Sequence, residues 1–338
     1  MHRLILTLLL TSAAAMRFEE FEVAFDKKYS SRERFVRRAH FERSVQRVAA
    51  HNAGGHSWRA GINQFSDLSD EEFKSKVLMR PQKCSATNTV GVPGAAENKK
   101  QKADLPPSID WRTRGVVSEV KNQGGCGSCW TFSTTGALEA HLALKAGAWR
   151  APRLSEQQLV DCAGAFDTKG CDGGLPSHAF EYIRHAGGLS TEFSYPYKAK
   201  DQKCTFNASA SVTAPQSNGI GIRVPGGSVN ISKGDEVALK YFLATRGPIS
   251  IAFDVASDFR DYKSGVYSST VCSHDAEHVN HAVLAVGYGV DPVSAKPYWL
   301  IKNSWDYTWG DSGYFRMEAF KNMCGVADCN SFPDLYGA

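Results

Sequence analysis

The feature that most constrains this chain is a set of nine cysteines behind a leader-like N-terminus. Within residues 1–15, Arg3 precedes an apolar run from Leu4 to Leu10 that is too short to cross a bilayer, and small residues follow from Ala13 to Ala15. This pattern predicts a secretory signal peptide and therefore a mature protein in an oxidising compartment, where disulfides persist. The cysteines are Cys84, Cys126, Cys129, Cys162, Cys171, Cys204, Cys272, Cys324 and Cys329. An odd count leaves one thiol unpaired as a candidate reactive group, while the sequence alone leaves the pairing of the other eight open.

Charge is divided unevenly between a front segment, residues 16–104, and a body, residues 105–338. The front segment has 17 Lys and Arg against 12 Asp and Glu, and the body has 21 against 23. This asymmetry is compatible with an acidic–basic pairing of the two parts within one chain, although by charge alone a basic solvated tail would be the more common outcome. The formal net charge of the chain is only +4, which gives no sign of nucleic acid as a partner. After the leader, the sequence contains no run of about 18 apolar residues, so no membrane span is predicted.

The hydrophobic pattern changes twice along the chain. Residues 17–52 repeat apolar positions at spacings of three and four, which predicts an amphipathic helix or helix pair, and residues 80–104 have the composition of an exposed linker. Periodicity predicts helices over 129–145, 155–162 and 177–185. Short apolar runs predict strands over 248–254, 281–287 and 298–302. The body therefore divides into a helical half, residues 105–215, and a strand-rich half, residues 216–338, which indicates an α+β fold.

Cys129 lies where a glycine-rich turn passes into a predicted helix. A thiol attacks a carbonyl only as the thiolate, and a helix N-terminus and a nearby imidazolium both lower its pKa. The turn at Gly124 to Gly127 would also let a substrate backbone approach closely. By position alone, a buried or disulfide-bonded cysteine would be the more common outcome.

The string from Cys126 to Trp130, Cys-Gly-Ser-Cys-Trp, matches the signature of papain-like cysteine proteases. Three further motifs resemble that family: Gln123 six residues before the thiol, His281 in a V-x-H-A strand, and Asn303 in N-S-W. The resemblance implies a papain-like two-lobed fold, with a helical left lobe, an antiparallel β-barrel right lobe and the active-site cleft between them. It also implies a cysteine-type peptidase that needs no cofactor and no metal.

The resemblance implies a role for each motif residue. Cys129 would be the nucleophile and His281 its base, oriented by Asn303, while Gln123 would help to form the oxyanion hole. The residues implied in substrate binding are Gly173, Gly174, Ala252, Asn280 and Trp305. Asp306 departs from the glycine that usually follows N-S-W, and we expect this to alter a surface turn only.

The front segment resembles the family's inhibitory propeptide. The propeptide helix motif is represented by Glu33, Arg37, Phe41, Ser44, Val48 and Asn52, with Ser44 and Val48 as departures. The G-x-N-x-F-x-D motif is complete in Gly61, Asn63, Phe65 and Asp67. The resemblance implies that this segment crosses the cleft and blocks it.

Residues 80–87 resemble the mini-chain of the cathepsin H group, whose pattern is E-P-Q-N-C-S-A-T. In that group a fragment of the propeptide stays attached by a disulfide, and its terminal carboxylate, here that of Thr87, holds the free amine of the substrate. The resemblance implies an aminopeptidase. Arg80 and Lys83 depart from the pattern, which leaves the release site of the mini-chain open. The implied disulfides are Cys126–Cys171, Cys162–Cys204, Cys272–Cys324 and Cys84–Cys329, which leave Cys129 free.

Three alternatives remain beside the aminopeptidase. The first is an endopeptidase of the same family that has lost the mini-chain. The second is a catalytically inactive peptide-binding relative, against which the intact catalytic motifs argue. The third is a zinc hydrolase built from a cluster of residues with ligand-like spacing, although no H-E-x-x-H string occurs. The members of that cluster are His274, Asp275, Glu277, His278 and His281.

The remaining expectations concern the setting of the protein. N-glycosylation motifs begin at Asn207 and Asn230. The expected partners are peptide or protein substrates, the chain's own propeptide and cystatin-type inhibitors, with the protein itself a monomer. The expected location is the secretory pathway, ending in a lysosome or outside the cell.

Overall fold

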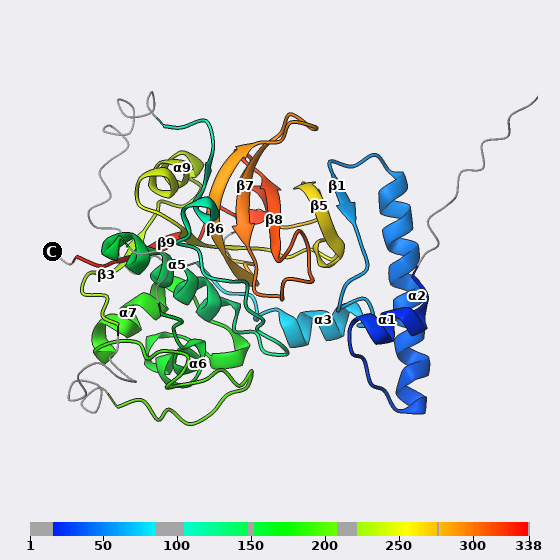
Figure 1. Cartoon of the computed structure of the whole chain (residues 1–338), viewed down its shortest axis with the longest axis horizontal. Coiled ribbons are helices and arrows are strands. Elements are labelled where there is room, and N and C mark those ends of the chain that lie inside the picture. The colour runs from blue at the N-terminus through cyan, green and yellow to red at the C-terminus, as the bar shows by residue number, and fades with distance from the viewer. Residues whose placement is uncertain (1–15, 85–104, 148–151, 208–221, 276, 337–338) are drawn as a thin grey trace, which may run out of the picture.

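The computed structural model describes residues 16–84, 105–147, 152–207, 222–275 and 277–336. The predicted signal peptide, Thr87 and the basic run of the linker lie outside the described residues. Figure 1 shows three layers, in which helices α1 and α2 stand on one side, a sheet lies in the middle, and helices α5 to α7 lie on the other side. Among the described helices, none is both long and apolar enough to cross a bilayer.

The front segment forms a small helical unit of its own. Its elements are α1 (Phe18–Ala24), α2 (Ser31–Ala53), β1 (Trp58–Ala60) and α3 (Asp70–Val77). Three buried aromatic rings, Phe18, Phe21 and Phe41, join α1 to α2, which confirms the predicted helix pair. The Ser69 hydroxyl oxygen accepts a hydrogen bond from the Glu72 N–H at the start of α3, and the Glu72 carboxylate accepts one from the Ser69 N–H. This capping box fixes where α3 leaves the unit and turns toward the body.

The helical half of the body begins with a short strand and then packs three helices. Its elements are β2 (Ile109–Asp110), the 3₁₀ turn η2 (Trp111–Arg114), α5 (Cys129–Ala146), α6 (Glu156–Cys162), η3 (Ala163–Phe166), η4 (Gly170–Asp172) and α7 (Pro176–Ala186). The three helices agree with the predicted ranges. Helix α5 is buried on nearly every side, and Gly147 ends it in the left-handed conformation at φ 58°. The helix that begins with Cys129 is therefore the central element of this half.

The second half of the body is rich in strands, as predicted. Its elements are β3 (Gly227–Asn230), α9 (Glu236–Thr245), β4 (Ile249–Phe253), η5 (Phe259–Asp261), β5 (Tyr262–Tyr267), β6 (His281–Val290), β7 (Pro297–Lys302), β8 (Tyr314–Glu318), η6 (Met323–Gly325) and β9 (Ser331–Asp334). The strand order β1-β5-β8-β7-β6-β4-β9-β3 is an open path, with β2 added beside β6. The expected closed, wholly antiparallel barrel is corrected on two counts, because the path does not close and β5 pairs with β8 in parallel.

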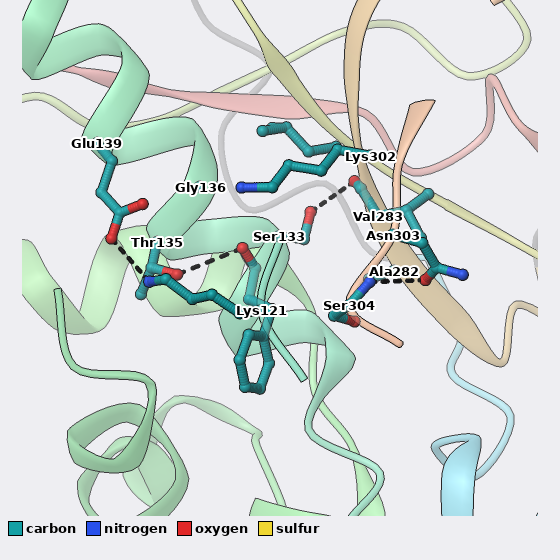
Figure 2. A pocket seen from close by; sticks show the side chains of 12 residues that line it. Lys121, Ser133, Thr135, Gly136, Glu139, Ala282, Val283, Lys302, Asn303 and Ser304 are labelled. Atoms are coloured by element: carbon teal, nitrogen blue, oxygen red, sulfur yellow. Dashed lines mark hydrogen bonds and ion pairs between the residues drawn. The ribbon is translucent and has the colours of Figure 1, made fainter. Parts of the chain in front are cut away.

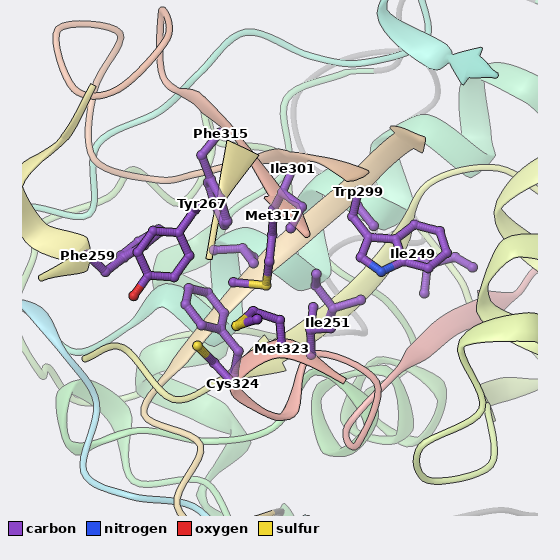
Figure 3. Packing of buried hydrophobic residues seen from close by; sticks show 14 of the residues in the cluster. Ile249, Ile251, Phe259, Tyr267, Trp299, Ile301, Phe315, Met317, Met323 and Cys324 are labelled. Carbon is purple, nitrogen blue, oxygen red and sulfur yellow. The ribbon is translucent and has the colours of Figure 1, made fainter. Parts of the chain in front are cut away.

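The first strand of this sheet comes from the front segment. Strand β1 pairs with β5 in antiparallel fashion, so residues far apart in the chain share one sheet. Behind the sheet lies a core rich in aromatic and sulfur-containing side chains, among them Phe259, Tyr267, Phe315 and Met317 (Figure 3). A second core joins α5 and α7 to the opposite face of β6. The two cores meet along β6, and this strand begins with His281.

Candidate active site

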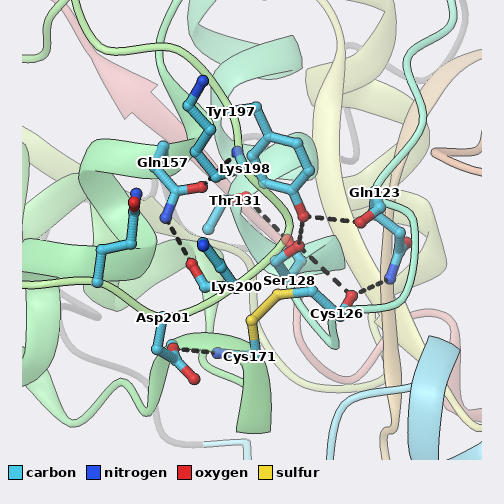
Figure 4. The surroundings of a disulfide bond; sticks show 12 residues. Gln123, Cys126, Ser128, Thr131, Gln157, Cys171, Tyr197, Lys198, Lys200 and Asp201 are labelled. Atoms are coloured by element: carbon cyan, nitrogen blue, oxygen red, sulfur yellow. Dashed lines mark hydrogen bonds between the residues drawn. A yellow bond between two sulfur atoms is a disulfide. The ribbon is translucent and has the colours of Figure 1, made fainter.

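Cys129 is the first residue of α5, and the turn before it is held by the Cys126–Cys171 disulfide (Figure 4). Gly127 lies in that turn where no side chain fits, because a Cβ would come within 2.4 Å of the Cys171 carbonyl oxygen and 2.8 Å of the Leu78 carbonyl oxygen. The second of these atoms belongs to the front segment. The turn therefore admits an extended backbone directly beside the thiol, which is what a peptide substrate would require.

His281 is the first residue of β6, and Asn303 directly follows the neighbouring strand β7. The Nε2 of His281 is 2.8 Å from the Oδ1 of Asn303, and the His281 ring stacks on Trp305 with centroids 4.5 Å apart. Since Asn303 Oδ1 is an acceptor, Nε2 carries the proton of this bond. The other ring nitrogen, Nδ1, is buried without a hydrogen-bond partner among the described residues. The structure thus holds the ring in one orientation and leaves one nitrogen available.

The amide of Gln123 is held in place from both ends. Its Oε1 accepts a hydrogen bond from the Ser304 hydroxyl at 2.8 Å, and its Nε2 donates to the carbonyl oxygens of Val77 at 2.7 Å and Cys126 at 2.9 Å. Tyr197 donates its hydroxyl proton to the Gln123 carbonyl at 2.8 Å (Figure 4). The sequence did not point to Tyr197 or Ser304. Val77 belongs to the front segment, so Gln123 already binds a peptide carbonyl beside the thiol.

The front segment runs through the site in an extended conformation after α3. The Met79 N–H donates to the Asn280 carbonyl at 3.1 Å, the Arg80 N–H to Asp172 at 2.9 Å, and the Gln82 N–H to Val279 at 2.8 Å. Met79 packs in the same buried cluster as Cys129, whose exposed fraction is 0%. The thiol is therefore closed off from solvent by the segment that lies across it.

This burial sets the charge state of the two central groups. Burial raises the pKa of the Cys129 thiol to about 12, and the Ala282 N–H, which donates to Sγ at 3.3 Å, offsets this in part. Burial also lowers the pKa of His281 to about 4, against the opposite effect of Asn303. Both groups are therefore neutral at neutral pH, and no hydrogen bond joins Sγ to the imidazole among the described residues. The site is assembled but not ionised.

Two known protein families match successive parts of this chain. The family model described as papain family cysteine protease matches residues 105–334, and that of the cathepsin propeptide inhibitor domain matches residues 18–73. The chain belongs to the papain family. It is a cysteine peptidase precursor, and its front segment contains the propeptide inhibitor domain.

The relatives include proteins of plants and animals. Thiol protease aleurain of Arabidopsis thaliana is 49% identical over 325 residues, covering 95% of this chain and 85% of aleurain. Pro-cathepsin H of Bos taurus is 46% identical over 324 residues, covering 95% of this chain and 90% of the relative. Among solved structures, the digestive procathepsin L2 proteinase of Tenebrio molitor superposes with a TM-score of 0.82 at 36% identity, covering 94% and 98% of the two chains.

The four disulfides of the structure are the four pairs that the family resemblance implied: Cys84–Cys329, Cys126–Cys171, Cys162–Cys204 and Cys272–Cys324. Cys129 is the free cysteine. The first of these bonds ties the end of the propeptide's extended stretch to the body. Arg80 and Lys83, the two departures from the mini-chain pattern, form ion pairs with Asp172 at 3.2 Å and Glu277 at 2.7 Å.

Of the implied substrate-binding residues among the described part of the chain, Gly173, Ala252 and Asn280 lie around this stretch, whereas Gly174 and Trp305 do not. A Cβ on Gly173, whose φ is 128°, would approach the Gln82 amide nitrogen to 2.7 Å, so this glycine lines the occupied cleft. Ala252 is buried in the cluster that contains Met79, and Asn280 supplies the carbonyl bound by Met79. Gly174 faces the other way, because its Cβ would meet the Trp130 ring at 2.9 Å.

Trp305 is covered by propeptide aromatics rather than by extended backbone. The rings of Phe65 and Phe73 each lie 5.5 Å from the Trp305 ring in edge-on contact. Asn63 of the same motif donates to the Arg260 carbonyl at 2.8 Å, and Asp67 accepts from Lys27 at 2.9 Å and Tyr29 at 2.7 Å. The G-x-N-x-F-x-D motif therefore shapes the part of the propeptide that covers Trp305.

A buried ionic cluster behind the site was not expected from the sequence (Figure 2). Lys121 donates to Glu139 at 2.8 Å and to Glu156 at 2.6 Å, and Lys302 donates to Ser118 at 3.0 Å. Burial lowers the pKa of Lys302 to about 8. Lys121 and Lys302 precede Gln123 and Asn303 closely in the chain, so the cluster fixes the backbone that presents both amides. No periodic pattern or motif marks this cluster in the sequence.

The remaining site expectations concern the two glycosylation motifs and the zinc-ligand cluster. Asn207 is exposed, whereas Asn230 is only 6% exposed and its amide oxygen accepts a hydrogen bond from Ser228. The folded structure therefore gives no support to a glycan at Asn230.

No group of three or more His, Cys, Asp or Glu that could hold a metal occurs among the described residues. Of the supposed zinc ligands, His281 faces Asn303 while His274 bonds the Asn322 carbonyl, so the zinc hydrolase finds no support.

Proposed function

We propose that this chain is the precursor of a cysteine aminopeptidase that retains residues 80–87 as a mini-chain in its cleft. The observation that carries the proposal is the Cys84–Cys329 disulfide, which fastens the stretch lying against Gly173 and Asn280 to the body. A propeptide that was wholly discarded would need no covalent bond at this point. The similarity of the chain to two relatives, pro-cathepsin H and aleurain, supports the same assignment.

The chemistry follows from the positions of four side chains. In the open enzyme, Cys129 would pass its proton to Nδ1 of His281, and the thiolate would attack the substrate carbonyl to form a C–S bond. The Cys129 N–H and the Gln123 amide would hold the oxyanion, and Gln123 already donates to the Val77 carbonyl. His281 would then protonate the leaving amine, and water would hydrolyse the acyl-enzyme. Asn303 would keep the ring aligned through both steps.

The mini-chain would turn this chemistry toward free N-termini. A carboxylate at Thr87 would attract the ammonium group of a substrate, and the bulk of residues 80–84 would exclude residues beyond it. The stretch lies on the side of Gly173 and Asn280, which we assign to the acyl half of the substrate. Only a short acyl half would therefore fit. An endopeptidase remains the alternative, because Arg80 leaves the cut that would release the mini-chain unassigned.

The test is an assay of the acid-activated precursor on two fluorogenic substrates with the same residue before the scissile bond. One substrate has a free amine, and the other carries that residue inside an N-blocked peptide. We expect turnover of the free-amine substrate only, abolished by a thiol-directed epoxide but not by a chelator. Good cleavage of the blocked peptide by the unchanged protein would instead favour the endopeptidase.

A matched pair of variants sharpens this test. Cys84→Ser breaks the bond to Cys329 and should shift activity toward the blocked substrate by about tenfold or more, since the mini-chain can then leave. Lys203→Ala changes an exposed residue near another disulfide and should leave the preference unchanged. Cys129→Ala should abolish both activities.

We further propose the setting in which this enzyme works. The predicted signal peptide and four disulfides support a route through the secretory pathway to a lysosome-type compartment or to the outside. Asn207 is the proposed glycosylation site, with the mature protein a monomer. Cystatin-type inhibitors would bind where the propeptide now lies.

A further inference from the structure

Asp306 is the residue after Trp305, and it occupies a backbone conformation that favours glycine. Its φ is +68°, a region that aspartate and asparagine tolerate better than most residues. Its Oδ1 accepts hydrogen bonds from the Thr308 N–H at 3.2 Å and the Thr308 hydroxyl at 3.3 Å. These bonds fix the direction of the side chain.

The turn that contains Asp306 is joined by backbone hydrogen bonds to the segment that carries Gln123. The Asp306 N–H donates to the Lys121 carbonyl at 3.1 Å, and the Gln123 N–H donates to the Ser304 carbonyl at 2.9 Å. The second carboxylate oxygen, Oδ2, is 3.5 Å from the Asn122 amide nitrogen. The carboxylate therefore lies on the rim of the cleft, one residue from the amide proposed to bind the oxyanion.

This rim is on the opposite side of the thiol from the mini-chain. The extended stretch after Val77 lies on Gly173 and Asn280, whereas Phe65 and Phe73, from the part of the propeptide before Val77, lie on Trp305. Gln64 also donates its amide proton to the Trp305 carbonyl. If the first side takes the acyl half of a substrate, the Trp305 side takes the leaving group.

No basic side chain neutralises Asp306 in this position. It takes part in none of the ion pairs between described residues, and it is partly exposed. Lys121, whose backbone carbonyl accepts the hydrogen bond from the Asp306 N–H, turns its ammonium group inward to Glu139 and Glu156. Removal of the propeptide would leave a fixed negative charge facing the leaving-group side.

We propose that Asp306 is a specificity-determining residue that favours a cationic side chain within the first two residues of the leaving group. The proposal rests on the proposed function only in placing the substrate between Cys129 and His281, and it holds for an aminopeptidase or an endopeptidase. An exposed ion pair of this kind contributes little to binding, so the preference for Lys over Gln should be about two- to fivefold in kcat/KM. It should shrink as salt rises.

The experiment compares peptides that differ only at the first or second position of the leaving group, with Lys, Gln or Glu there. Both free-amine and N-blocked series are used with the mature enzyme, so that whichever mode operates gives a readout. The variants are Asp306→Asn, which keeps the turn bonds and removes the charge, and Asp306→Gly, which suits the positive φ and removes both.

We expect both variants to lose the order Lys over Gln over Glu while the Gln peptides are cleaved as before. An unchanged order in Asp306→Asn would overturn the proposal. An equal loss on all peptides would also overturn it, because it would show a structural role for the turn. Absence of turnover by the unchanged enzyme in both series would instead contradict the proposed function.

Discussion

Two stretches of the propeptide cover the catalytic body, and different forces hold them. Residues 58–73 are held by strand pairing of β1 with β5, by aromatic contacts and by the ion pair between Asp70 and Arg260. Residues 77–84 make few backbone hydrogen bonds, but a disulfide fastens their end to Cys329. The first stretch can dissociate when conditions change, whereas the second needs both a peptide cut and reduction. The difference predicts that inhibition by the first stretch is reversible, whereas the second stretch would stay attached, as the proposed mini-chain requires.

The largest effect is expected from truncating Trp58, a buried residue of the first stretch that packs on the body. Trp58 is 3% exposed, lies 5.2 Å from the Tyr267 ring, and donates its indole N–H to the Ser268 carbonyl at 3.3 Å. Trp58→Ala should weaken the closed state by about 3–5 kcal/mol, as for other large aromatic truncations. Alkylation of Cys129 in the intact precursor, which requires opening, should then be about a hundredfold faster or more at fixed pH.

Phe35→Ala is the matched control for Trp58→Ala. Phe35 lies on α2 of the same propeptide but is 79% exposed. Its truncation should leave the alkylation rate of Cys129 unchanged. If Trp58→Ala behaved like this control, the cleft stretch and its disulfide alone would account for the protection of the thiol, and the comparison would fail.

Trp58 also shows where sequence-based prediction ended. The family signature and its three accompanying motifs pointed to Cys129, Gln123, His281 and Asn303, and the helix ranges followed from local apolar patterns and capping residues. Strand β1 has only three residues, so its single buried–exposed–buried alternation is too short to mark it as the edge of a sheet whose partner lies some 200 residues away. Pairing of this kind depends on tertiary contacts.

The buried ionic cluster and Tyr197 were missed for the same reason. Lys121, Glu139, Glu156 and Lys302 come from four separate segments, and charged residues are normally exposed. The open sheet was also beyond prediction, because strand order is not encoded in the period-2 pattern of any one strand.

The next test uses pH to open the first stretch. His281 has a pKa of about 4 in the closed precursor, because burial disfavours the imidazolium, against a usual value of 6.5. An exposed ring in the open state would bind a proton first, so acid favours opening. The contribution of His281 to the stability of the closed state is therefore fully present above pH 6.5. It falls toward pH 4 by about 1.4 kcal/mol per pH unit, and by about 3 kcal/mol in all.

The measurement is urea-induced opening of a Cys129→Ala precursor, which cannot cut itself, between pH 7 and pH 4. The double variant Cys129→Ala, His281→Gln should lose most of the dependence above pH 4.5. Glu72 is the internal comparison, because its bond with Arg37 lowers its pKa to about 2 and its contribution is lost only as pH falls from 4.5 toward 2. An unchanged slope in the double variant would assign the acid sensitivity to carboxylates of the body.

The smallest expected effect concerns the ion pair between Lys83 and Glu277, which belongs to the second stretch. Both side chains are more than half exposed, at 73% and 51%, so the pair should contribute no more than about 1 kcal/mol. With the disulfide intact, Lys83→Gln should not change mini-chain retention, measured by mass spectrometry of the mature enzyme. In a Cys84→Ser background the pair is one of the remaining contacts, and Lys83→Gln should then lower retention by up to about fivefold. A clear loss in the disulfide-bonded protein would mean that the covalent bond does not dominate this stretch.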